Sequence, residues 1–220
     1  MMSRDEPRSR IVDVAFALAG DAVPVDHGYR LYAALCAAVP ELHGATWLAV
    51  HPLSGTPTDP GTLALRNPAS LLLRLPAERI PDVLPLSGRT IEVAGARLTL
   101  GAPKVSALVP ASSLDARLVI LKLTGAPRRE NQELGRRSLD SGAFAERYSA
   151  ELTRQLAELD IPSMLELCGR RSMTVGGKRI IGYSVRVSAL SAAQSLALQT
   201  NGLGGKRRMG CGIFRATRGP

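Results

Sequence analysis

The sequence predicts an α+β fold in which one element order, β-α-β-β-α-β, occurs twice. Residues 11–18 alternate as a half-buried strand does, and a helical pattern over residues 28–39 follows them. An apolar strand-like run over residues 114–123 comes before the clearest helical pattern of the chain, over residues 143–159. Because this order is that of a ferredoxin-like unit, we expect a tandem ferredoxin-like protein.

The first domain is expected over residues 10–110. Its first helix follows Asp26, a suitable N-cap, has Leu31 and Leu35 on its apolar face, and stops at Pro40. The other expected elements are a loop over 20–25, a loop over 44–60, a hairpin of strands 62–66 and 70–75, a short helix over 76–84, and a hairpin of strands 90–93 and 97–100.

The second domain is expected over residues 111–220. Its long helix carries apolar residues on one face, namely Ala145, Tyr148, Leu152, Leu156 and Leu159. The remaining expected elements are a polar linker over 125–142, a hairpin of strands 165–175 and 179–189 turned by Gly176-Gly177, a helix from the cap Ser191 to about Thr200, a glycine-rich run, and a last strand over 210–215.

Positive charge is concentrated at the end of the chain. The chain has 28 lysines and arginines against 19 aspartates and glutamates, a net charge of +9. Residues 169–220 contain ten of these cations and no carboxylate, so the preceding residues together are slightly negative. Cations beside backbone N–H groups exposed by glycines suit the phosphates of nucleic acid, and the alternative is a solvated basic surface.

Composition excludes several other classes. No apolar run is long enough to span a membrane, and the charged N-terminus is unlike a secretory signal. Cys36, Cys168 and Cys211 are far apart, which indicates reduced thiols in a cytoplasmic protein and offers no metal site. Aromatic residues make up only 4% of the chain, so we expect RNA contacts to phosphate, sugar and shape more than to stacked bases.

The glycine-rich run is Gly202-Leu-Gly-Gly-Lys-Arg-Arg-Met-Gly-Cys-Gly212, which has the form G-x-G-x5-G-x-G. It lacks the Lys-Ser/Thr ending of a P-loop, and it follows a helix where a dinucleotide fingerprint follows a strand. At the end of a tandem ferredoxin-like chain, the run resembles the hallmark loop of the CRISPR-associated endoribonucleases of the sixth Cas family, which belong to the RAMP superfamily. The stretches 26–35 and 47–55 are also similar to type I members of that family.

This resemblance implies metal-independent cleavage of precursor CRISPR RNA within its repeats, without a cofactor. It also implies CRISPR repeat RNA as the partner, and other Cas subunits of a surveillance complex as possible partners. In this family a histidine of the N-terminal domain commonly transfers the proton. Two alternatives stay open: a non-catalytic RNA-binding RAMP subunit, and a ferredoxin-like RNA-binding module unrelated to CRISPR.

Histidine suits proton transfer in such a reaction because its ordinary pKa is about 6.5. Three candidates exist. His51 is the first choice, because its context resembles that of the family's catalytic histidine. His27, at the junction of strand and helix, is the second choice, and His43 is expected in a turn. Tyr32 is a candidate hydroxyl donor, although core packing is its more ordinary role.

Candidate RNA-binding residues lie in the glycine-rich run and beside the predicted hairpin turn. In the run, the cations can meet phosphates and the glycines allow close backbone approach. Beside the turn, the cations can enter a groove of an RNA stem or form a solvated tip. The candidates are Gly202, Gly204, Gly205, Lys206, Arg207, Arg208 and Gly210 of the run, and Arg170, Arg171, Lys178 and Arg179 of the hairpin.

Overall fold

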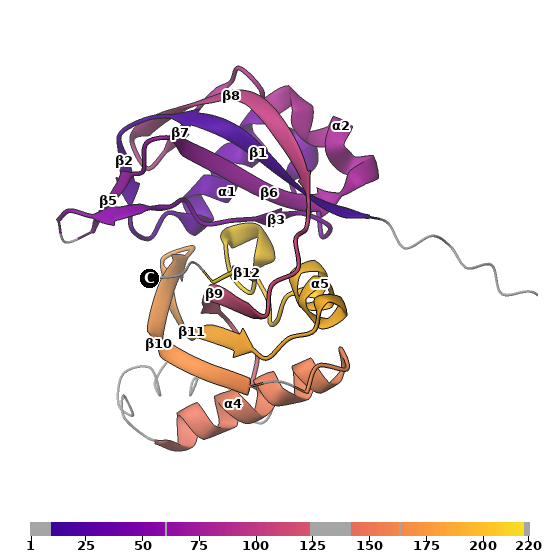
Figure 1. Cartoon of the computed structure of the whole chain (residues 1–220). Coiled ribbons are helices and arrows are strands. Elements are labelled where there is room, and N and C mark those ends of the chain that lie inside the picture. Colours follow the sequence, from indigo (N-terminus) through magenta and orange to yellow (C-terminus); the bar gives the residue numbers. More distant parts are fainter. Residues whose placement is uncertain (1–9, 60, 124–141, 163, 218–220) are drawn as a thin grey trace, which may run out of the picture. The chain divides into compact units, whose positions relative to one another are not determined.

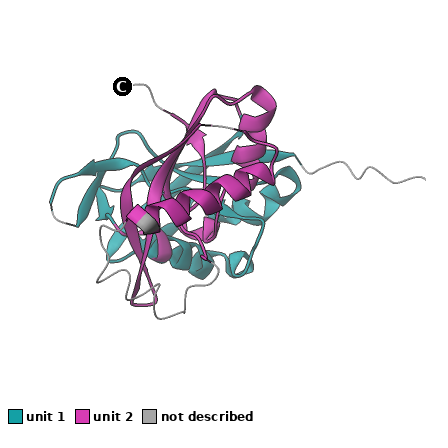
Figure 2. Ribbon diagram, turned by 90° about the horizontal axis from the view of Figure 1, so that it is seen from below, with its two compact units in different colours: residues 1–25, 30–108 teal, residues 26–29, 109–220 magenta. Residues whose placement is uncertain are grey.

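The computed structural model describes residues 10–59, 61–123, 142–162 and 164–217 (Figure 1). The chain divides into two compact units, which Figure 2 colours separately. The first unit comprises residues 1–25 and 30–108, and the second comprises residues 26–29 and 109–220. The start of the first helix therefore groups with the second unit. Over the described residues, no helix has the length and hydropathy that crossing a membrane requires.

The first unit is built on a five-stranded antiparallel sheet with the order β3-β6-β1-β8-β7. A smaller sheet has the order β2-β5-β4. The elements of the first unit are β1 (Ile11–Ala19), β2 (Ala22–Pro24), α1 (Gly28–Ala38), which begins in the second unit, η1 (Pro40–Leu42), β3 (Ala49–Val50), β4 (Gly55–Pro57), β5 (Thr62–Leu65), β6 (Ala69–Pro76), η2 (Ala77–Arg79), α2 (Ile80–Val83), η3 (Leu84–Leu86), β7 (Thr90–Val93) and β8 (Ala96–Ala107).

Several expectations for the first unit are confirmed, and one pairing is wrong. The first strand, the first helix and the β7–β8 hairpin occur as expected. The expected hairpin of residues 62–66 and 70–75 does not form, because β5 pairs with β2 and β4 while β6 pairs with β1 and β3. The expected loops over 20–25 and 44–60 contain β2, β3 and β4, which are too short to give a periodic signal.

The second unit has a four-stranded antiparallel sheet with the order β10-β11-β9-β12. Its elements are β9 (Ser113–Val119), α4 (Gly142–Ala157), β10 (Met164–Val175), β11 (Lys178–Ser188), α5 (Ala192–Asn201), η4 (Arg207–Met209) and β12 (Arg215–Ala216). In both units the strands follow ferredoxin-like order, with β7 added at one edge of the first. The predicted tandem ferredoxin-like fold is confirmed.

One core of the second unit lies where α4 and α5 pack on its sheet. Tyr148, Leu152 and Leu156 of α4 are buried there as their spacing predicts, together with Val185 and Val187 of β11. The opposite face of the sheet carries a smaller cluster of buried residues: Leu118, Ile120, Met173 and Cys211. Since Cys211 lies within the glycine-rich run, this second cluster anchors that run to the sheet.

Local sequence patterns predict the hairpin turn and the helix start of the second unit correctly, but not its last strand. Val175 pairs with Lys178 around Gly176-Gly177, and the side chains of Ser191 and Gln194 form a reciprocal capping box at the start of α5. The expected strand over 210–215 is wrong, since the last strand, β12, comprises only Arg215 and Ala216, which pair with β9. The expected polar linker over 125–142 lies, except for its last residue, outside the described residues.

Candidate functional site: the glycine-rich loop and the start of α1

The glycine-rich loop, residues 202–212, is fixed by backbone hydrogen bonds to β9 and to the residue that follows it. The N–H of Gly205 donates to the carbonyl of Ile120 (2.9 Å), and the N–H of Gly212 donates to that of Leu118 (2.8 Å). Gly202 caps the C-terminus of α5, and Gly210 follows η4 at the far end of the loop. The loop is therefore an ordered part of the second unit.

Gly204 and Gly205 differ in what their backbone approaches. A β-carbon on Gly204, which has φ +69°, would lie 2.4 Å from the carbonyl oxygen of Ile120. A β-carbon on Gly205 would meet no atom within 4 Å. The sequence predicts that Gly204 and Gly205 serve close backbone approach or a positive φ. Gly204 has the positive φ and packs its backbone against Ile120, whereas Gly205 has open space beside it.

The three cations of the loop are half-buried and are not equivalent. The guanidinium of Arg207 turns back and donates from Nη2 to the carbonyl of Thr200 (2.8 Å), near the C-terminus of α5. A cation there stabilises the helix end, where carbonyl groups concentrate negative potential. Lys206 has left-handed backbone (φ +65°), and Arg208 lies in η4. Arg207 thus supports the end of α5, and Lys206 and Arg208 stay candidates for phosphate contacts.

His27 lies directly before α1, among the residues that group with the second unit, and it is completely buried. Both of its neighbours are held by that unit. The carboxylate of Asp26 accepts a hydrogen bond from the backbone N–H of Thr174 in β10 (2.7 Å). A β-carbon on Gly28 would lie 2.3 Å from the carbonyl oxygen of Met209 in η4. His27 is therefore fixed beside the glycine-rich loop.

A cationic group that sequence analysis missed lies on the same unit. Where β9 faces β11, the register shifts between Ala116 and Val119, so Arg117 and Leu118 together oppose one residue, as in a β-bulge. Desolvation, and next the repulsion from Arg171, lower the pKa of Arg117, while Asp26 acts in the opposite direction. Arg117 still keeps exposed surface. The sequence signal that could have identified Arg117 is the presence of an arginine inside an apolar strand.

The thiol of Cys211 is neutral. Burial raises its pKa to about 12, against the opposing influence of Lys206 and Arg117. The thiol contacts the sulfur of Met173 at 3.2 Å. Since a nucleophilic cysteine needs a lowered pKa and access to solvent, Cys211 is a packing residue.

The β10–β11 hairpin presents the four predicted cations. Arg171, Lys178 and Arg179 are exposed, and Arg170 is half-buried. The guanidinium of Arg179 donates to the hydroxyl of Ser172 (3.0 Å) across the hairpin. Arg171 of this hairpin is close enough to Arg117 of β9 for its charge to lower the pKa of that arginine.

The other sequence candidates belong to the first unit. His51 follows β3, is buried, and donates its backbone N–H to the carbonyl of Leu72 (2.9 Å). His43 is exposed at the end of η1, as expected of a turn residue. Tyr32 is buried in α1, where its hydroxyl donates to the carbonyl of Leu42 and accepts from the N–H of Gly44, each at 3.0 Å. These bonds occupy the hydroxyl and agree with a packing role.

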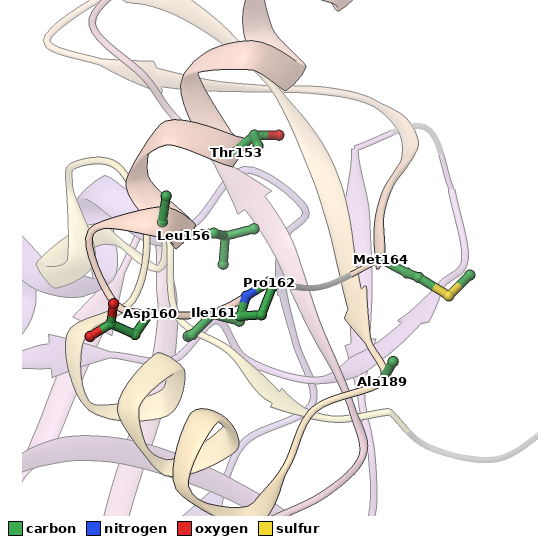
Figure 3. Close-up of a pocket in the computed structure, with 8 residues that line it drawn as sticks. Thr153, Leu156, Asp160, Ile161, Pro162, Met164 and Ala189 are labelled. Carbon is green, nitrogen blue, oxygen red and sulfur yellow. The ribbon is translucent and has the colours of Figure 1, made fainter.

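Two further features lie outside this candidate site. An open pocket of about 870 Å³ is found beside the C-terminal end of α4, with an apolar lining that includes Leu156, Ile161, Pro162 and Met164 (Figure 3). None of the predicted site residues lines it. Within the described part of the chain, no group of three His, Cys, Asp or Glu side chains is arranged to hold a metal ion.

Two ferredoxin-like units in tandem, with an ordered glycine-rich loop before the last strand, define the fold class of this protein. The family model described as Cas6 Crispr matches residues 12–219. This chain therefore belongs to the Cas6 family.

The relatives agree with this assignment. The chain is 36% identical over 203 residues to the "CRISPR-associated endonuclease Cas6" of Myxococcus xanthus (strain DK1622), covering 92% of this chain and 80% of that protein. A solved "CRISPR associated protein Cas6" has a TM-score of 0.60 at 13% identity and covers 94% of this chain and 100% of its own. "An RAMP protein binding different RNA substrates" has a TM-score of 0.58 at 14% identity, with 95% and 100% covered. At such identities the solved structures show the fold alone.

Proposed function

We propose that this protein is a CRISPR-associated RNA endonuclease that cuts precursor CRISPR RNA within its repeats, without a metal ion. The family membership and the named activity of the Myxococcus xanthus relative support the reaction class. The single observation that carries the site is the packing of Gly28 against Met209, which puts His27 beside a cationic glycine-rich loop.

In the proposed reaction the ribose 2′-hydroxyl attacks the adjacent phosphate. The 2′-oxygen–phosphorus bond forms as the bond from phosphorus to the 5′-oxygen breaks. A base takes the 2′ proton and an acid protonates the leaving 5′-oxygen, so the products are a 2′,3′-cyclic phosphate and a 5′-hydroxyl. Cations near the phosphate stabilise the charge that develops on it, and Lys206, Arg208, Arg117 and Arg171 are the candidates.

His27 is favoured over His51 for proton transfer. His27 adjoins the loop within the second unit, whereas His51 is buried after β3 in the first unit. Because His27 is also completely buried, the proposal requires that RNA binding opens the residues covering it. Catalytic contacts commonly tighten only in the complex with substrate.

The test is single-turnover cleavage of a repeat RNA by the purified protein in excess chelator. We expect cleavage to persist in chelator and to stop when the nucleotide 5′ of the scissile phosphate is 2′-deoxy. His27→Ala should slow cleavage by about 100-fold or more with little change in affinity. Cleavage that needs added magnesium would overturn the mechanism. Normal cleavage by His27→Ala, with loss in His51→Ala, would restore the first sequence choice.

A protein that binds repeat RNA but never cuts it would instead be a non-catalytic RAMP subunit. In that case His27→Ala and His51→Ala would both bind as the wild type does.

A further inference from the structure

We propose that Asp26 is a positioning residue for the cleavage reaction, which acts by tying His27 to the strand β10. This inference rests on the proposed role of His27. The observation behind it is the hydrogen bond from the backbone N–H of Thr174 to the Asp26 carboxylate, which joins residues 148 positions apart.

The donor in this bond is outside the sheet ladder. β10 is at one edge of the β10-β11-β9-β12 sheet, and its other side has no strand partner among the described residues. Outward N–H groups of an edge strand are available to ligands or to other segments of the chain. The carboxylate of Asp26 accepts a hydrogen bond from the outward N–H of Thr174 at 2.7 Å, a distance typical of a charge-assisted hydrogen bond.

His27 is thereby held from both sides. Asp26 fixes the backbone before it to β10, and Gly28 fixes the backbone after it against Met209. Both contacts act on the residues flanking His27, so they position its backbone. A misplacement of a catalytic group by about 1 Å can cost about 100-fold in rate, so a bond of modest strength can matter greatly for catalysis.

The charge of Asp26 argues against direct contact with RNA. A carboxylate repels phosphate oxygens, and Asp26 is exposed, close enough to Arg117 for its charge to raise the pKa of that guanidinium. Its usefulness at this position therefore comes from accepting the hydrogen bond of Thr174.

Four variants test the proposal. Asp26→Ala removes the acceptor, and we expect single-turnover cleavage at saturating protein to fall about 10- to 100-fold with unchanged RNA affinity. Asp26→Asn keeps an acceptor oxygen and should restore the rate to within about threefold of wild type. Thr174→Pro removes the donor at an edge position that tolerates proline, and should match Asp26→Ala. Thr174→Val keeps the N–H and is the matched control, with wild-type rate expected.

A readout independent of activity is the NMR signal of the His27 imidazole, assigned by comparison with His27→Ala. Asp26→Ala and Thr174→Pro should shift this signal and leave that of His43 unchanged, while Thr174→Val leaves both unchanged. A wild-type rate together with an unmoved His27 signal in Asp26→Ala overturns the inference. Equal loss in Asp26→Asn and Asp26→Ala also overturns it, because the hydrogen bond would not be the cause. If wild-type protein does not cut RNA, the proposed function fails, and the NMR signal still decides whether Asp26 positions His27.

Discussion

The backbone of Gly28 passes so close to Met209 that a β-carbon on Gly28 would lie 2.3 Å from the Met209 carbonyl oxygen. Alanine inside a helix is ordinarily more favourable than glycine by about 1 kcal/mol. Gly28 is the first residue of α1. From helix propensity alone, replacing Gly28 by alanine would therefore be neutral or stabilising.

We therefore expect Gly28→Ala to destabilise the protein, by about 1–3 kcal/mol, because the clash is with backbone and a backbone shift is needed to relieve it. The shift also moves His27, so cleavage should slow as well. Chemical denaturation followed by circular dichroism measures the first effect. A more stable Gly28→Ala protein would mean that η4 moves away at little cost.

The glycine-rich loop offers a second pair of alanine substitutions. Gly204→Ala meets the Ile120 carbonyl at 2.4 Å and has a positive φ, so it should cost about 1–3 kcal/mol of folding free energy. Gly205→Ala has open space and should change stability by less than about 0.5 kcal/mol. If RNA approaches the open side of Gly205, then Gly205→Ala weakens RNA binding in a protein of normal stability, as a filter-binding assay would show.

The cations of the loop should separate into two groups in a salt series. Lys206→Ala combined with Arg208→Ala should flatten the plot of log affinity against log salt by about 1.4, if each contacts one phosphate of single-stranded RNA. Arg207→Ala should instead lower stability by about 1 kcal/mol, because the Thr200 carbonyl loses its charged donor. An unchanged slope in the double variant would identify these cations as a solvated surface.

Thiol labelling should distinguish the three cysteines. Cys168 is exposed, so iodoacetamide should modify it in the native protein, although burial and then Glu166 raise its pKa. Labelling of Cys168 should therefore speed up as the pH rises from 7 to 9, since the thiolate is the nucleophile. Cys211, with its pKa near 12, should stay unmodified until the protein is unfolded. Peptide mass spectrometry after timed labelling measures this, and early modification of Cys211 would mean that the loop opens readily.

Local signals in the sequence predicted most of the second unit. Gly176-Gly177 specifies a two-residue turn, and the Ser191 capping box specifies a helix start; both depend on residues within a few positions of one another. The spacing of Tyr148, Leu152 and Leu156 predicted the buried face of α4 for the same reason.

The errors concern contacts between distant residues. β5 and β6 are adjacent in sequence but pair in different sheets, which no local pattern specifies. Asp26 was expected to cap α1 from its position, and its carboxylate in fact accepts from Thr174. The sequence supplied the candidate cations and histidines. It could not show that His27 and the loop adjoin, since this depends on Gly28 and Met209, which are 181 positions apart.

The grouping of residues 26–29 with the second unit has a consequence for how the protein is made. On the ribosome, His27 emerges long before Thr174 and Met209 are synthesised, so the surroundings of His27 are completed only near the end of translation. Contacts of such high sequence separation form late and slow folding. A nascent chain interrupted after residue 108 would carry all three histidines and none of the loop. A gene fragment encoding residues 109–220 alone would make the loop without the segment that packs against it, so expression of either half should give an inactive product.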